Sequence, residues 1–228
     1  MNEQSQFIHE CLRHVESERL LRLSTPGLLA RVQAIKQFQH ARFERSYADL
    51  QDEPRYAKAT AFFLRDIYSS ADYSERDAQF ARIVPALVRL FPRDIVATVA
   101  QLVELHALSE RLDTAMAGKF HDTQVTAPTY AAAWRAVGEP QSRQRQVELM
   151  LAVGSALDRY TRKPFWRQSL KLMRGPAQAA GLGALQQMLE KGFDTFRELE
   201  GAQEFLNTIS LRETNLSRRL FAGENIAC

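Results

Sequence analysis

The chain has 228 residues, of which 45% are hydrophobic and 25% are charged, a balance that is typical of ordinary globular proteins. Thirty Lys and Arg residues against 27 Asp and Glu give a net charge of +3, which is too small an excess to predict nucleic acid or anionic lipid as a partner. The two cysteines, Cys11 and Cys228, cannot form a disulfide framework and match no metal-ligand spacing.

The first residues, 1–13, are too polar for a secretory signal. No apolar run approaches the roughly 18 residues that a membrane-spanning helix needs. Free thiols suit a reducing compartment. Together these features predict a cytoplasmic protein that does not enter the membrane.

Apolar residues recur with a period close to 3.6 along almost the whole chain, and no stretch keeps for long the period of two that marks a β-strand. Thr25 and Pro26 predict the N-cap and first turn of a second helix that extends to about residue 50, and Ser74 with Asp77 forms a capping-box pattern. No linker or obvious repeat interrupts the pattern. The sequence therefore predicts one all-α domain over residues 1–228, a bundle of about eight or nine helices.

Four motifs carry a resemblance to a known family. They are FFLRDIY at 62–68, DYSERD at 72–77, MRGPAQAAGLGALQ at 173–186 and FLNTISLRE at 205–213. Together they resemble the signature of a family of uncharacterised bacterial all-helical proteins, with Ser70 as a departure where a glycine is expected in the turn. The resemblance implies an all-α fold and a bacterial cytoplasmic setting, and it brings no known activity.

Several polar residues fall inside the apolar arcs of the predicted helices, where an unpaired polar group costs roughly 1–3 kcal/mol. On the helix predicted from about 92 to 116, His106 and Asp113 share the arc of the apolar residues, as Glu213 does on the last helix. These groups should therefore meet one another inside the bundle. We predict an internal polar network drawn from Arg76, His106, Asp113, Glu213, Asp66 and Arg42.

Two interpretations of this network stay open. It is either a set of structural ion pairs that fixes helix register, or a small-molecule pocket with His106 as base or hydrogen-bond donor and Arg76 as anion anchor. The first function that we predict is a non-catalytic interaction or ligand-binding protein. The alternative is a small-molecule enzyme with its site at the network. A homodimer is expected from the aromatic content and the common habit of soluble helical proteins.

Metal and cofactor sites find little support in the sequence. Carboxylate di-iron bundles need two Glu-x-x-His pairs, and the chain contains none. His9, Glu10 and His14 miss the zinc motif His-Glu-x-x-His by one residue, which turns the second imidazole off the shared face. We therefore predict no metal and no cofactor.

A basic segment with interleaved aromatic residues is the remaining candidate. Its cations are Arg159, Arg162, Lys163 and Arg167. Such a patch can bind phosphate-rich partners through charge and stacking. The simpler interpretation is that Phe165, Trp166, Leu170 and Met173 dock on the bundle while the cations stay in water, and it argues against a nucleic acid partner.

Overall fold

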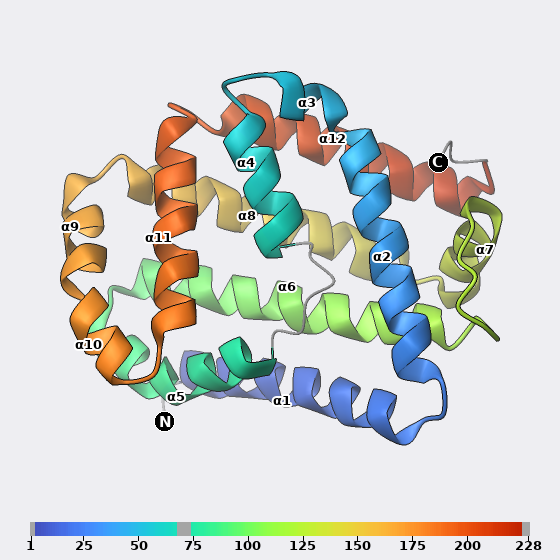
Figure 1. The fold of residues 1–228 in the computed structure, drawn as a ribbon, viewed down its shortest axis with the longest axis horizontal. Coiled ribbons are helices and arrows are strands. Elements are labelled where there is room, and N and C mark those ends of the chain that lie inside the picture. The colour runs from blue at the N-terminus through green and yellow to red at the C-terminus, as the bar shows by residue number, and fades with distance from the viewer. Residues whose placement is uncertain (1–2, 68–73, 225–228) are drawn as a thin grey trace.

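The computed structural model describes residues 3–67 and 74–224, and every regular element in them is a helix (Figure 1). The all-α prediction is confirmed. In chain order the elements are α1 (Glu3–Ser24), α2 (Leu28–Ser46), α3 (Ala48–Asp52), α4 (Ala57–Phe62), the π-helix η1 (Phe63–Ile67), α5 (Ser74–Leu90), α6 (Arg93–Ala117), α7 (Ala127–Val137), α8 (Pro140–Thr161), α9 (Pro164–Leu172), α10 (Arg174–Ala179), α11 (Gly183–Glu198) and α12 (Gln203–Ala222).

The described residues hold more helices than the eight or nine predicted. The segment predicted as one helix from 26 to 50 is divided at Tyr47, whose backbone (φ −123°, ψ 18°) leaves helical geometry between α2 and α3. Gly175 and Pro176 lie inside the short α10.

The predicted start of the second helix is also wrong. Helix α2 begins at Leu28, and its N-cap position is held by Gly27 in the left-handed region (φ 71°). Glycine adopts this conformation without the strain that a Cβ atom would add. Thr25 and Pro26 therefore belong to the turn before the helix, where the carbonyl of Thr25 accepts a hydrogen bond from the backbone N–H of Leu28.

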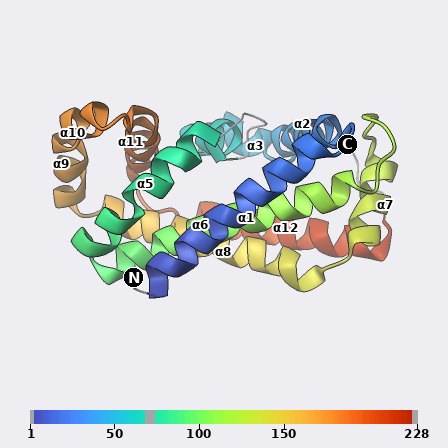
Figure 2. The same ribbon diagram turned by 90° about the horizontal axis from the view of Figure 1, so that it is seen from below.

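Helix α6 is the centre of the bundle. It packs against α1 on one side and α8 on the other, and it also contacts α2 and α7. Figure 1 shows α2 and α11 running across these long helices, and Figure 2 shows α1 passing obliquely over α6. Because several helices cover α6, it buries residues over much of its length, from Val96 to Met116.

Apolar packing surrounds α6 in three clusters. Ile8 and Val96 belong to the cluster shared by α1, α5 and α6, and Tyr130 to the one at the α7 end. The third lies around α8, α11 and α12, and there the helix backbones approach closely: a Cβ atom on Gly154 of α8 would lie 2.6 Å from Leu206 Cδ2 of α12. Glycine at this position allows the two helices to cross.

Candidate functional site

A cavity of about 220 Å³ lies beside α6, between α2, α8 and α12, with further residues from α1, α5, α7 and α11. Much of its wall is apolar, and this part includes Phe43, Phe80, Leu105, Val147, Met150 and Leu216. The polar part includes four residues of the predicted network: Arg42, His106, Asp113 and Glu213. The 3.6-residue periodicity therefore placed these four side chains on helix faces that meet at one interior space.

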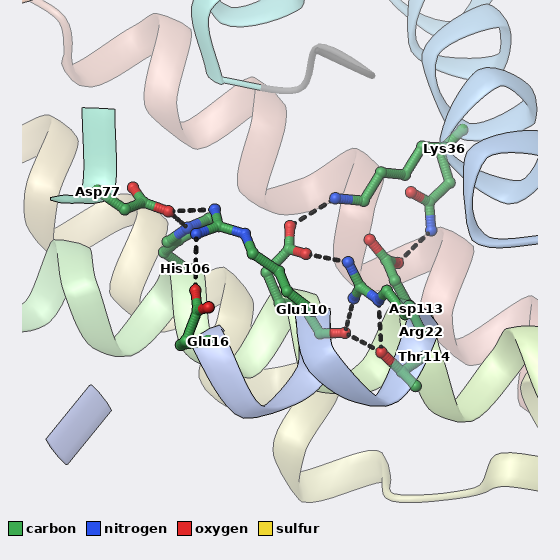
Figure 3. A network of polar contacts seen from close by, with 10 residues as sticks. Glu16, Arg22, Lys36, Asp77, His106, Glu110, Asp113 and Thr114 are labelled. Carbon is green, nitrogen blue, oxygen red and sulfur yellow. Dashed lines mark hydrogen bonds and ion pairs between the residues drawn. The ribbon is translucent and has the colours of Figure 1, made fainter. Parts of the chain in front are cut away.

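Asp77 and His106 form the first polar group of the wall (Figure 3). The His106 Nε2 atom lies 2.8 Å from Asp77 Oδ2, and Arg19 donates to the same oxygen at 2.5 Å. Burial raises the pKa of Asp77, but the hydrogen bonds and charges of His106 and Arg19 outweigh it, so that the pKa lies below its ordinary value. Asp77, which local spacing assigns to a helix cap, thus connects α5 to α1 and α6.

Glu110 is the centre of the second polar group (Figure 3). Its carboxylate accepts hydrogen bonds from Arg22 Nη1 and from Lys36 Nζ, both at 2.5 Å. Arg22 also donates to the Glu110 carbonyl and, through Nε, to Thr114 Oγ1. Burial raises the pKa of Glu110, but the charges of Lys36 and Arg22 prevail and lower it to about 2. Glu110 is therefore a carboxylate at neutral pH and joins α1, α2 and α6.

Arg42 and Glu213 form the third polar group, between α2 and α12. Arg42 donates from both terminal nitrogens to the two carboxylate oxygens, at 3.0 and 3.1 Å, and the Tyr47 hydroxyl donates to Glu213 at 2.7 Å. Burial lowers the pKa of Arg42, but the charge and hydrogen bond of Glu213, together with the Tyr130 and Tyr47 hydroxyls, outweigh it, so that the pKa lies above its ordinary value. A bidentate pair of this kind fixes the relative orientation of two helices.

Asp113 and Arg143 complete the polar wall. Asp113 Oδ1 accepts a hydrogen bond of 3.0 Å from Gln39 Nε2, and burial raises the pKa of its carboxyl group. Arg143 donates to Gln146 Oε1 at 3.1 Å, and its guanidinium lies 3.7 Å over the ring of Trp134. Its Nε and Nη2 atoms are buried without an acceptor, and burial lowers its pKa.

Sequence reasoning missed Lys36, Glu110 and Arg143. Each stands among polar residues in its helix and resembles a solvent-facing charge, so that only the tertiary contacts reveal its burial. Two predicted members, Asp66 and Arg76, have side chains outside the described residues. The proposed role of Arg76 as anion anchor therefore stays a prediction.

Two of the four cations of the basic segment form ion pairs with neighbouring carboxylates. Arg162 pairs with Asp158 at 2.7 Å and Arg167 with Asp194 at 3.0 Å, whereas Arg159 and Lys163 are exposed. The prediction that Phe165, Trp166, Leu170 and Met173 dock on the bundle is only partly correct. Trp166 packs against Phe91, with ring centroids 6.4 Å apart, but Phe165 is 66% exposed and Met173 49%.

No group of three or more His, Cys, Asp or Glu side chains that could hold a metal ion occurs in the described ranges. Cys11 is buried with Ile8 and Val15, and desolvation raises the pKa of its thiol to about 11. A thiol with this pKa is a poor nucleophile near neutral pH. Across residues 3–67 and 74–224, no helix is both long and apolar enough to span a membrane.

Comparison with known proteins gives one match. The model of a domain of unknown function, DUF8198, matches residues 18–227. No curated protein and no solved structure matches the chain. The geometry of the cavity is therefore the basis on which a function can be argued.

Proposed function

The chain belongs to the DUF8198 family, and because that match brings no activity, we propose from the cavity itself that the protein is a non-catalytic binding protein for a small, largely apolar molecule. The observation that carries the proposal is an interior space of about 220 Å³ with a mainly apolar wall and a few convergent polar groups. Such a space is what a small-molecule site requires, and a bundle built only for stability would close it, since empty volume costs packing energy.

The state of the polar groups favours binding over chemistry. Glu110 and Glu213 each accept hydrogen bonds from two cationic or hydroxyl donors, and Asp77 accepts from Arg19 and contacts His106. Carboxylates that are committed to such partners hold the walls in place. They are poorly available to move protons.

The cavity volume limits the ligand to about nine non-hydrogen atoms, by proportion to the roughly 150 Å³ cavity that holds benzene in another protein. Toluene and indole are suitable neutral probes. In a thermal-shift titration each should raise the melting temperature of the native chain progressively with concentration, because a molecule that binds only the folded state stabilises it by mass action.

A variant that fills the cavity makes this test specific. Val147→Phe places an aromatic ring at the cavity wall and should abolish the toluene and indole shifts while the chain still melts cooperatively. Leu211→Phe, at a side chain that is 64% exposed, is the matched control and should leave both shifts unchanged. Equal shifts in the two variants, or no shift in the wild type, would contradict the proposal.

The second candidate is a small-molecule enzyme with His106 as general base. The hydrogen bond of 2.8 Å between His106 Nε2 and Asp77 Oδ2 favours it, because a carboxylate in this position orients an imidazole. Chemical conversion of metabolites incubated with the protein, followed by mass spectrometry and lost in His106→Gln, would support it. Unchanged metabolites together with tight binding would support the non-catalytic proposal.

A homodimer and a bacterial cytoplasmic setting remain predictions from the sequence. The dimer is supported by exposed apolar side chains such as Leu23 and Leu172, 71% and 79% exposed. Light scattering on the purified chain at several concentrations would measure its mass directly.

A further inference from the structure

Three of the charged groups in the cavity wall are matched by partners within the protein. Glu110 is held by Arg22 and Lys36, Glu213 by Arg42, and Asp77 by Arg19. Once these pairs are set aside, one carboxyl group and one guanidinium remain in the same wall. They are Asp113 on α6 and Arg143 on α8.

Both remaining groups are buried, Asp113 with 7% of its surface exposed and Arg143 with 5%. Among the described residues, neither forms an ion pair, and they do not hydrogen-bond to each other. Asp113 receives one amide hydrogen bond from Gln39, and Arg143 gives one to Gln146. A buried guanidinium without an opposite charge is costly, and stacking of Arg143 on Trp134 offsets only part of that cost.

Two glutamine amides fix the positions of Asp113 and Arg143. The Gln39 amide contacts both Asp113 Oδ1 and the Tyr130 hydroxyl, the latter at 3.4 Å. On the other side, the Gln146 amide accepts from Arg143 and donates to Ser109 at 2.9 Å, so the hydrogen bonds define its orientation. Each of the two groups is thus held by a neutral amide and, among the described residues, has no ion-pair partner.

We propose that Asp113 and Arg143 bind the two charged groups of a small zwitterion, the simplest of which is an amino acid with an apolar side chain. The ammonium group would pair with Asp113, the carboxylate with Arg143, and the side chain would lie against the apolar wall near Val147 and Met150. A simple anion would be attracted by Arg143 but repelled by Asp113. A simple cation would be attracted by Asp113 but repelled by Arg143. Only a ligand with both charges satisfies both groups.

This inference rests on the proposed function, because it names the class of molecule that the cavity takes. L-leucine has a size close to the limit of about nine non-hydrogen atoms set by the cavity volume. Its single-charge analogues, 4-methylpentanoate and 3-methylbutylamine, keep the branched chain and lack one charged group each. Comparing the three ligands separates the two charge contributions from the apolar contribution.

The test is calorimetric titration of the full chain with the three probes at neutral pH. L-leucine should bind at least about tenfold more tightly than either analogue, since each charged hydrogen-bonded contact is typically worth that factor. Equal affinity of L-leucine and one analogue would overturn the inference, as would toluene binding without any L-leucine binding. In both cases the apolar cavity of the proposed function would stand, whereas failure of toluene to bind would remove that function as well.

Two variants assign the charges to residues. Asp113→Asn should weaken L-leucine and 3-methylbutylamine and should not weaken 4-methylpentanoate, which loses a like charge beside its carboxylate. Arg143→Met should weaken L-leucine and 4-methylpentanoate and should not weaken the amine, for the same reason with the signs reversed. Asp49→Asn and Arg218→Met, at exposed positions away from the cavity, are matched controls. The same loss for all three probes in a folded Asp113 or Arg143 variant would overturn the assignment, and the wild-type comparison holds even where a variant fails to fold.

Discussion

Replacing Glu110 with Gln removes the carboxylate that Arg22 and Lys36 share and keeps nearly the same side-chain volume. The pKa of Glu110, lowered from 4.5 to about 2, corresponds to about 3 kcal/mol of folding free energy at neutral pH. The substitution also leaves two cations without their partner in the interior. We therefore expect Glu110→Gln to lower the free energy of unfolding by roughly 3–5 kcal/mol at pH 7.

The sign of the pH dependence follows from the lowered pKa. A carboxyl group that is more acidic in the folded state stabilises the fold above its unfolded pKa, near 4.5, and loses this contribution as the pH falls toward about 2. Urea denaturation of the wild type and the variant at pH 7, 4 and 3 measures the difference. The difference should be largest at pH 7 and clearly smaller at pH 3.

An exposed pair of similar geometry provides the control. Lys58 and Glu198 lie 2.6 Å apart, but their side chains are 72% and 44% exposed. Glu198→Gln should therefore cost less than about 1 kcal/mol. A Glu110→Gln variant as stable as the wild type at pH 7, or a difference in unfolding free energy that stays constant as the pH falls, would contradict a structural role for the buried carboxylate.

Two further substitutions test the packing and the third ion pair. Gly154→Ala should lower the free energy of unfolding by about 1–3 kcal/mol, because its Cβ atom would lie 2.6 Å from a Leu206 methyl group. The control is Gly175→Ala, where a Cβ atom would have nothing within 4 Å, and it should be neutral or stabilising in the same urea denaturation series. Glu213→Gln should lower the melting temperature strongly, since it leaves the buried Arg42 with a neutral partner in place of a carboxylate. Glu204→Gln, in an exposed pair with Arg55, is the control, and a change for Glu213→Gln as small as the change for this control would contradict the structural role of the buried pair.

The fold class could be predicted because periodic apolar residues determine which face of each helix is buried, whatever the partner. The breaks between helices were harder to predict from the sequence. Tyr47 carries no turn signal in the sequence, and α3 separates from α2 through local backbone geometry. The Gly27 cap was overlooked because Thr25 and Pro26 offer a stronger local pattern.

The polar residues of the cavity wall could likewise be predicted only in part. Asp113 and Glu213 stand among apolar residues on their own helices, so periodicity alone predicts that they turn inward. The sequence around Lys36 and Glu110 does not show that they turn inward, because they are buried by contact with each other, and the two residues lie 74 positions apart in the sequence. Arg143 lies in the polar first turn of α8, where a charged residue ordinarily faces water. The burial of such residues follows from the arrangement of the helices and not from the local sequence.

A crystal structure of the chain grown with saturating L-leucine would show directly whether Asp113 and Arg143 bind a zwitterion. We expect one leucine in the cavity beside α6, with its carboxylate within hydrogen-bond distance of Arg143 and its ammonium group within reach of Asp113. A leucine bound elsewhere, a leucine whose charged ends avoid these two side chains, or a direct ion pair between Asp113 and Arg143 across a closed space would contradict it.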